Sequence, residues 1–377
     1  MSILVIAPTL KTPSGHDHAF CTELVQCGGD SDVRILASDK FQPEPGLPAL
    51  PFFSVDPYEY RWIHNEAKRS LSWTTLLRAA VQDLRKIDFA SYDRLIFHTA
   101  DPIYLTALSR CLARFRGTFY LGFTLPPSFW LRQTTGRRIV SIVSDLAIGS
   151  FRRKARLVLY SETGAVRFDH RAIKCHLKLG PVESVEYPSL FDRQPLRDSR
   201  NPIKLGFFGA PLDDKGFRIL LELAECAEIQ SAFQIRLFLP PGQQELVEKI
   251  NAGRGVVRAS SESRDVPTYF ECMSSVDLVY TLYSPLAYKD RMSGIVQDAI
   301  LAGKPLLITT GCTEMRRFID RVAPGAYAQS DYSVVGATKS LVSAVDDVDV
   351  LLKKARKGTE TIRRLKTFEV FFDSGEG

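Results

Sequence analysis

One stretch of the sequence combines the start of a helix with charged side chains on both sides of it. Residues 283–311 read YSPLAYKDRMSGIVQDAILAGKPLLITTG, in which Ser293 is a candidate N-cap and Gly294 lets a ligand approach the backbone closely. The N–H groups of Gly294 and Ile295 have no acceptor inside such a helix, and the helix dipole adds positive potential at this end. The sequence therefore predicts an anion site here, of the kind that binds phosphate groups.

The charged residues around this helix start fit a nucleoside diphosphate. Lys289 and Arg291 lie just upstream and are placed to neutralise a diphosphate. Asp298 lies about one helical turn into the helix, where a carboxylate is suited to accept hydrogen bonds from the two hydroxyls of a ribose. Gly303 is expected to end the helix. The plain alternative is an ordinary α/β helix with a glycine at its end and incidental charges.

Short apolar runs alternate with helical patterns in both halves of the sequence. In such an arrangement the candidate residues around the helix start lie near the ends of strands. Strand-like runs are found at 3–8, 32–38, 92–99, 116–124, 154–162, 203–210, 233–240, 277–283 and 305–311. Helical patterns are found at 73–87, 215–229, 294–303 and 349–368. This rhythm predicts parallel sheets covered by helices. Residues 186–202 are rich in Pro, Asp, Arg and Ser and are typical of a linker, so we expect two α/β domains with a ligand cleft between them.

The composition agrees with a cytoplasmic enzyme. The chain has 377 residues, 45% hydrophobic and 24% charged, which favours two globular domains. Its seven cysteines are scattered without a CxxC pair, which favours free thiols in a reducing compartment and argues against a disulfide framework or a zinc site. The opening MSILVIAPTL is typical of a first strand and not of a signal peptide, and no apolar run is long enough to span a membrane.

A basic stretch adds a prediction about partners. The net charge is +6, and between Arg132 and Arg156 Asp145 is the only acid, with Trp130 and Phe151 nearby. Such a stretch indicates a peripheral contact with an anionic membrane or a lipid-diphosphate acceptor. A solvated basic face is an equally open alternative, and no nucleic acid partner is expected.

The stretch 283–311 resembles the donor-site signature of the large retaining GT-B glycosyltransferase family, which includes glycogen- and sucrose-synthase-like enzymes and bacterial exopolysaccharide glycosyltransferases. Asp290 and Asp298 stand with seven residues between them, and Ala302-Gly303-Lys304-Pro305 follows before the strand. The resemblance implies that Asp290 contacts the donor sugar and Asp298 the ribose hydroxyls. It also implies that the backbone at Ser293, Gly294 and Ile295 holds the diphosphate.

A second match supports this resemblance. KLGFFGAPLDDKGFRILLEL, residues 204–223, is similar to the opening of the family's C-terminal domain. Gly209 falls on the family's turn glycine and Lys215 on its phosphate-binding lysine. A lysine there balances the charge that grows on a leaving nucleoside diphosphate. The resemblance thus implies catalytic roles for Lys215, Asp290 and Arg291, whereas a solvated lysine after an acidic turn is the alternative for Lys215.

The N-terminal half resembles the family more loosely. Gly15 falls in the Gly-containing loop that these enzymes place near the donor phosphates, and His16 follows it as a candidate for acceptor binding. His98 and Asp101 stand at a predicted strand end, where they are candidates for binding acceptor hydroxyls. His18 is a weaker candidate.

The resemblance implies two Rossmann-like domains that face each other across a cleft. We assign residues 1–188 to an acceptor-binding domain, 189–201 to a linker, 202–355 to a nucleotide-sugar-binding domain and 356–377 to a C-terminal helix and tail. The implied activity is the transfer of a sugar from a UDP-, GDP- or other nucleoside-diphosphate sugar to a saccharide or lipid-linked acceptor. It implies retention of configuration and needs no cofactor or metal.

Departures from the family pattern keep other functions open. Both acids are Asp where the family has Glu, and Ala210 stands where an arginine is common. The first alternative is therefore a catalytically silent GT-B-like protein that binds nucleotides or acts as a scaffold. A GT-B nucleotide-sugar epimerase is the second.

Overall fold

The chain divides into two units, each with its own parallel sheet. In this computed structural model the described residues are 1–12, 16–57, 66–122, 135–161, 178–179, 201–253, 255–261, 266–289, 292–364 and 368–372. The first unit comprises Met1–Glu183 together with Lys366–Gly377, and the second comprises Ser184–Leu365. The last residues of the chain therefore group with the first unit. The expected linker, 189–201, lies almost entirely outside the described residues.

The sheet of the first unit has seven strands in the order β3-β2-β1-β4-β5-β6-β7, and all neighbouring strands are parallel. The strands are β1 (Ser2–Ala7), β2 (Asp32–Ser38), β3 (Ala49–Phe53), β4 (Arg94–Phe97), β5 (Thr118–Gly122), β6 (Arg156–Ser161) and β7 (Lys178–Leu179). Alternate residues of β1 enter two different cores: Leu4 and Ile6 pack on one face, Ile3 and Val5 on the other. Burial on both faces explains why this strand is an unbroken apolar run.

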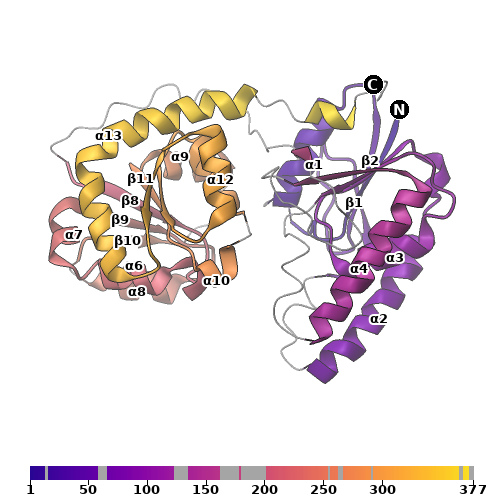
Figure 1. Ribbon diagram of the computed structural model, residues 1–377, viewed down its shortest axis with the longest axis horizontal. Helices are drawn as coiled ribbons and strands as arrows, with labels where there is room; N and C mark the ends of the chain where they lie inside the picture. The colour runs from indigo at the N-terminus through magenta and orange to yellow at the C-terminus, as the bar shows by residue number, and fades with distance from the viewer. Residues whose placement is uncertain are drawn as a thin grey trace. The chain divides into compact units, whose positions relative to one another are not determined.

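Helices cover both faces of this sheet. They are α1 (His16–Cys27), α2 (Glu66–Leu84), α3 (Pro102–Cys111) and α4 (Thr135–Lys154), with short 3-10 turns η2 (Phe89–Ser91) and η5 (Phe368–Phe371). Helices α2, α3 and α4 lie side by side (Figure 1). They pack on the Leu4 and Ile6 face, to which α3 contributes Tyr104 and Leu108.

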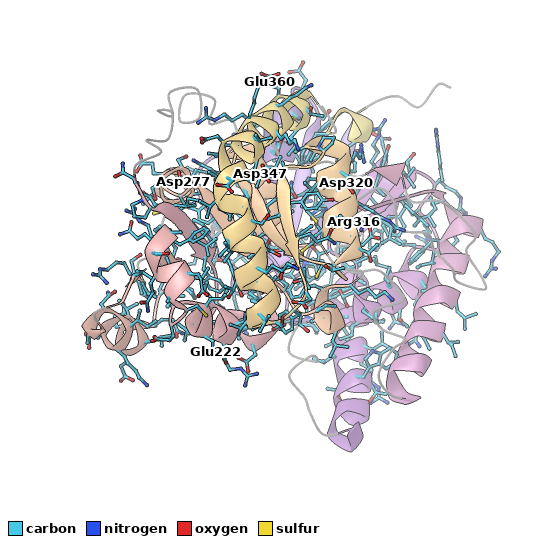
Figure 2. All side chains as sticks on the ribbon, turned by 60° about the vertical axis from the view of Figure 1, so that its left-hand side comes forward. Glu222, Asp277, Arg316, Asp320, Asp347 and Glu360 are labelled. Carbon is cyan, nitrogen blue, oxygen red and sulfur yellow. The ribbon has the colours of Figure 1, made fainter. Side chains whose placement is uncertain are left out.

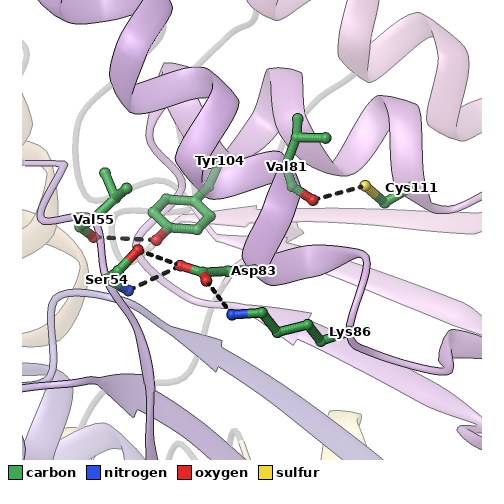
Figure 3. A network of polar contacts seen from close by, with 7 residues as sticks. All are labelled: Ser54, Val55, Val81, Asp83, Lys86, Tyr104 and Cys111. Carbon is green, nitrogen blue, oxygen red and sulfur yellow. Dashed lines mark hydrogen bonds and ion pairs between the residues drawn. The ribbon is translucent and has the colours of Figure 1, made fainter.

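Figure 3 shows a polar network that fixes α2 to the end of β3. Asp83 is 4% exposed and accepts hydrogen bonds from the N–H and hydroxyl of Ser54 at 2.9 and 2.7 Å and from Lys86 Nζ at 2.9 Å. Burial alone would raise the pKa of Asp83, but these hydrogen bonds outweigh it and the pKa is lowered. Tyr104 of α3 donates to the carbonyl of Val55 at 3.1 Å. The buried charge of Asp83 is thus satisfied, and the segment after β3 bonds to α2 through Ser54 and to α3 through Val55.

The final turn, η5, completes the opposite face of this unit. Phe368 and Phe371 are 3% and 0% exposed, and their rings lie 5.3 and 5.9 Å from that of Phe20 in α1. The Phe371 ring also meets Tyr120 of β5 at 5.0 Å, and its carbonyl accepts a hydrogen bond from Arg94. Residues from the two ends of the chain therefore share one core.

The sheet of the second unit has six parallel strands in the order β10-β9-β8-β11-β12-β13. They are β8 (Ile203–Phe208), β9 (Phe233–Phe238), β10 (Val257–Ser260), β11 (Leu278–Thr281), β12 (Leu306–Thr309) and β13 (Tyr327–Ser330). Leu205 and Phe207 of β8 pack with Leu220 and Leu341 in its main core. The strands expected at 203–210, 233–240, 277–283 and 305–311 are all confirmed, each within a few residues.

The helices of this unit depart from expectation in two places. They are α6 (Phe217–Leu223), α7 (Ala227–Ala232), α8 (Gln244–Ala252), α9 (Val266–Ser274), α10 (Pro285–Tyr288), α11 (Gly294–Leu301), α12 (Thr313–Val322) and α13 (Val334–Arg364), with the 3-10 turn η4 (Asp213–Lys215). The helix predicted at 215–229 is two helices, because Cys226 is extended and begins α7 anew. The helix predicted from 349 begins at Val334. In Figure 2 its solvent side carries Asp347 and Glu360, while Arg316 and Asp320 form a 3.6 Å ion pair on α12.

Each sheet has one point at which the order of strands reverses. In the first unit it lies between β1 and β4, and in the second between β8 and β11. Loops that leave the carboxyl ends of such a pair diverge, and ligands of open α/β sheets bind in the space they leave. The loops after β8 and β11 contain Lys215 and the start of α11, respectively.

Candidate functional site

Lys215 and Gly209, which the sequence assigns to one phosphate site, lie together in the structure. Gly209 follows β8 directly and has φ +113, a conformation that other residues rarely adopt. A Cβ built on Gly209 would lie 3.1 Å from Lys215 Nζ, so the ammonium group lies over the glycine backbone. Lys215 is partly exposed at the end of η4. The pair presents a positive charge at the carboxyl edge of the sheet.

The turn that carries Lys215 is held by the end of β11. The Tyr280 hydroxyl donates to the carbonyl of Gly216 at 2.9 Å, and the N–H of Ser284 donates to the carbonyl of Asp214 at 2.8 Å. Gly216 has φ +70, and a Cβ there would lie 2.2 Å from the Leu282 carbonyl oxygen. Only glycine fits this close approach, so the loops after β8 and β11 are locked together at the reversal point.

The start of α11 is built as the sequence predicts. Ser293 occupies the N-cap position with φ −124 and ψ 131, but its side chain makes no capping hydrogen bond. In the first turn, the N–H of Val296 donates to the Ser293 carbonyl at 3.0 Å, and the N–H groups of Gly294 and Ile295 are the ones placed to meet a ligand. Gly294 is exposed, and nothing lies within 4 Å of the position that a Cβ would take. Gly303, with φ +65, follows the end of the helix. The result is an open helix N-terminus.

Asp298 lies one turn into α11 and contacts α9. Its Oδ2 accepts a hydrogen bond of 2.7 Å from the Tyr269 hydroxyl. Burial, followed by the charge of Asp298 and this hydrogen bond, raises the pKa of Tyr269 well above its usual value. Tyr269 therefore remains a donor at any physiological pH.

The loop before α11 is fixed at one end. The carbonyl of Lys289 accepts hydrogen bonds from the N–H groups of Thr313 and Glu314, at 3.0 and 3.3 Å, where α12 begins. Asp290 and Arg291 lie outside the described residues, as does Gly15, so their assigned roles stay predictions. His16 is the first residue of α1, and its side chain is likewise not described.

The two candidates after β4 have structural roles. His98 is 4% exposed and stacks on Phe20, with ring centroids 3.6 Å apart and planes 9° apart. Asp101 is 5% exposed and caps α3, accepting from the N–H groups of Ile103 and Tyr104 at 2.8 and 3.0 Å. Both lie at the reversal point of the first sheet, as expected, but both face the protein interior. The weaker candidate His18 forms a hydrogen bond with the Glu44 carboxylate through Nε2.

Two residues of this region have no signature in the sequence that marks them as part of a site. Tyr269 occurs in an apolar run and has the pattern of a core residue. Glu314 is 3% exposed and accepts from Arg317 at 2.6 Å through Oε1, although an acid in the first turn of an amphipathic helix is usually a surface residue. Neither stands in a motif, so no sequence signal marked them.

Two further properties concern metals and membranes. Across the described ranges, no group of three or more His, Cys, Asp and Glu side chains is arranged to hold a metal ion. No helix in the same ranges has the length and apolarity that a membrane span requires. Six of the seven cysteines fall within them, and these six are free thiols.

Known proteins resemble this chain in structure and not in sequence. No protein-family model and no curated protein matches the sequence. Sucrose-phosphate synthase from Thermosynechococcus elongatus superposes with a TM-score of 0.66 at 12% identity, over 98% of this chain and 96% of that one. The glycosyltransferase WaaG, involved in lipopolysaccharide biosynthesis, gives 0.59 at 13%, over 98% and 97%. HepE of Anabaena, solved in complex with UDP, gives 0.55 at 14%, over 99% and 97%. The chain has the GT-B glycosyltransferase fold over nearly its whole length.

Proposed function

We propose that this protein is a glycosyltransferase that transfers a sugar from a nucleoside-diphosphate sugar to a saccharide or lipid-linked acceptor. The observation that carries the proposal is the pairing of Lys215 over Gly209 with the open start of α11, on the two loops that leave the sheet at β8 and β11. A cation and an exposed helix N-terminus, on the two loops that leave one reversal point, are suited to a diphosphate.

Each residue has a role in the proposed reaction. The backbone at Ser293, Gly294 and Ile295 binds the diphosphate, and Asp298 accepts hydrogen bonds from the ribose. Lys215 and Arg291 neutralise the negative charge that the leaving nucleoside diphosphate gains as the bond to the sugar breaks. These contacts stabilise the transition state more than the bound substrate, which is how they accelerate the reaction.

The remaining assignments rest on the resemblance to retaining GT-B enzymes. In this proposal Asp290 contacts the donor sugar, Gly15 and His16 lie near the phosphates and the acceptor, and the sugar keeps its anomeric configuration. Because His98 and Asp101 are buried, we assign them a structural role at this edge of the first sheet, where they hold in place the residues that touch an acceptor. Product NMR that shows an inverted anomer would remove retention.

Calorimetry with UDP, GDP and dTDP tests donor binding. UDP is the first probe because HepE, of the same fold, was solved with it. We expect one diphosphate to bind, and Lys215→Ala and Asp298→Ala to weaken binding at least about tenfold, since hydrogen bonds to charged groups contribute about 1.5–3 kcal/mol. Lys249→Ala removes an exposed charge from α8 of the same unit and serves as the matched control.

Turnover separates the enzyme from the silent alternative. Hydrolysis of a matching sugar diphosphate is followed by the release of free sugar. Diphosphate binding without any turnover would favour a catalytically silent protein. Ala210, which stands where an arginine is common in the family, is the observation in favour of that alternative. Conversion of the donor sugar to its epimer without transfer would favour the epimerase. Absence of binding to all three diphosphates would overturn the proposal.

We further propose that the first unit docks on anionic membrane through α4, at the cytoplasmic face. Ile142 and Leu146 stand one turn apart on α4 and are 54% and 67% exposed. Arg153 is exposed on the same helix, whose sequence holds five basic residues and one acid. Exposed apolar side chains on a basic helix suit insertion among acyl chains beneath anionic headgroups. Much of the predicted contact, including Arg132, lies outside the described residues.

A further inference from the structure

The hydroxyl of Tyr269 fixes one oxygen of Asp298. The donor lies on α9 and the acceptor on α11, and the 2.7 Å separation is that of a strong hydrogen bond to a charged oxygen. Phenol and carboxylate come from segments 29 residues apart. The contact is therefore a product of tertiary packing between the two helices and not of local sequence.

Tyr269 is itself held in place by two aromatic rings, one at the end of β8 and one on its own helix α9. Its ring meets the edge of Phe208 at 5.9 Å and 77°, and that of Phe270 at 5.2 Å and 79°. Phe208 in turn stacks on Phe238 at 4.7 Å and 15°, and it is 2% exposed. Phe208 immediately precedes Gly209, so a single packed group links the phosphate turn to the position of Asp298.

A hydrogen bond to one oxygen fixes the orientation of a carboxylate and still lets the group accept further hydrogen bonds. A carboxylate accepts about four hydrogen bonds, so Asp298 can accept others while Tyr269 holds Oδ2. An aspartate also reaches one methylene less far than the glutamate found in the resembling family. For such a short side chain, a fixed orientation decides whether its oxygens meet a ligand's hydroxyls.

We propose that Tyr269 is a positioning residue that orients Asp298 to bind the 2′- and 3′-hydroxyls of the donor's ribose. This inference rests on the proposed function, because it assumes that a nucleoside diphosphate lies at the start of α11. Tyr269 acts through Asp298 and does not itself touch the ribose. Its specific consequence is that the protein distinguishes a ribonucleotide from the same nucleotide without its 2′-hydroxyl.

Paired calorimetry with UDP and dUDP tests this consequence. We expect wild-type protein to bind UDP about tenfold more tightly than dUDP, the effect of one hydrogen bond to a charged group. Tyr269→Phe keeps the ring and removes the hydroxyl. Tyr269→Phe should reduce the ratio of UDP affinity to dUDP affinity about threefold or more. The reduction should come mainly from weaker binding of UDP, while the binding of dUDP changes little. A role in folding alone would alter both affinities together.

A matched control is available in the same unit. Tyr327 donates to Asp320 Oδ1 at 3.0 Å in an exposed tyrosine–aspartate pair, and Tyr327→Phe should leave the ratio at the wild-type value. Asp298→Asn provides a second route if Tyr269→Phe does not fold. Asp298→Asn should also lose the preference for UDP over dUDP. The double variant, with Tyr269→Phe and Asp298→Asn, should lose no more of this preference than either single variant does.

The outcomes distinguish the inference from the function on which it rests. Failure of the wild-type protein to bind UDP, GDP or dTDP overturns the proposed function. If the protein binds GDP and not UDP, GDP and dGDP replace UDP and dUDP in the test. Equal affinity for the ribonucleotide and its 2′-deoxy form overturns the inference alone, as does binding of dTDP without binding of UDP or GDP. So does an unchanged ratio in Tyr269→Phe, or, where that variant does not fold, in Asp298→Asn.

Discussion

Lys304 shows how strongly a single buried charge can affect the second unit. The residue is 4% exposed, and its Nζ donates to the Ser274 carbonyl at 2.8 Å. The pKa of Lys304 is lowered to about 8, mainly by burial; Asp277 opposes this shift, and the charges of Arg356 and Lys204 add to it. The folded protein therefore binds this proton less tightly than the unfolded chain does.

The stability of the second unit should consequently depend on pH above neutrality. Between pH about 8 and 10.5 the unfolded chain holds more protons at Lys304 than the folded protein, so the free energy of unfolding rises with pH. The rise amounts to about 3 kcal/mol at 1.36 kcal/mol per pKa unit. Lys304→Met keeps the length of the side chain and removes the titration.

Urea unfolding followed by far-UV circular dichroism at several pH values measures this effect as the difference between wild type and Lys304→Met. Other groups that titrate in the window, such as Cys312 with a pKa raised by burial to about 11, are common to both proteins and cancel. A difference that stays constant from pH 8 to 10 would show that Lys304 is not responsible.

At the scale of residues, the sequence predicts the position of a residue along a strand, turn or helix. It does not predict side-chain contacts that depend on how distant elements pack. The positions of Gly209 and Lys215 after β8 follow from a strand, a turn and a helix in a fixed order, while their role in binding phosphate stays a prediction. His98 was correctly placed at the end of a strand, but its orientation depends on stacking against Phe20. The partnership of Tyr269 with Asp298 depends on two helices packing together, and nothing local to either residue encodes it.

At the scale of elements, hydrophobic periodicity located the strands well and the helix ends less well. Buried parallel strands are short apolar runs that stand out from their surroundings, as β2 and β9 do. The sequence does not predict edge strand β3, because Pro51 interrupts its pattern. A proline has no backbone N–H to donate, so a strand tolerates it where one side has no neighbouring strand, as at this edge. The break between α6 and α7 was missed because the apolar spacing continues across Cys226.

Helix α4 makes the membrane proposal testable. Replacing both Ile142 and Leu146 by Ser should reduce partition onto phosphatidylcholine vesicles that contain phosphatidylglycerol by at least about tenfold. The reason is that each fully buried aliphatic side chain contributes about 1.5–3 kcal/mol. Co-sedimentation measures the bound fraction.

The matched control for this experiment replaces two exposed valines on α13. Val342 and Val350 are 43% and 51% exposed, and their replacement by Ser should leave partition unchanged. Equal binding to vesicles with and without phosphatidylglycerol would contradict the docking proposal, as would equal binding by the α4 variant.

At the scale of the whole molecule, each unit has a separate core, and the first one includes the end of the chain. All three tryptophans, Trp62, Trp73 and Trp130, precede residue 183, so their fluorescence reports on the first unit alone. Far-UV circular dichroism reports on both. The Pro-rich stretch predicts a linker at 189–201, most of which lies outside the described residues, whereas no pattern in the sequence indicates the return of η5, because four residues carry no period.

Phe371→Ala should therefore destabilise the first unit while the second is unaffected. Removing a fully buried phenylalanine costs about 3–5 kcal/mol. We expect the tryptophan transition to move to lower urea concentration, with the remaining circular dichroism transition unchanged. Phe372→Ala, next to it but only partly buried, is the milder control. A shift of the second transition alone would contradict the assignment of η5 to the first unit.

The place of η5 also determines when the first unit can be finished during synthesis. Its sheet is translated early, yet Phe368 and Phe371 follow only after the 182 residues Ser184–Leu365. At about 5–20 residues per second, the ribosome needs roughly 10–40 s to add them. For that interval the nascent unit presents Phe20 and Tyr120 without their covering rings, a surface that a chaperone can bind. Completion of the first unit thus has to wait until the whole second unit has been translated.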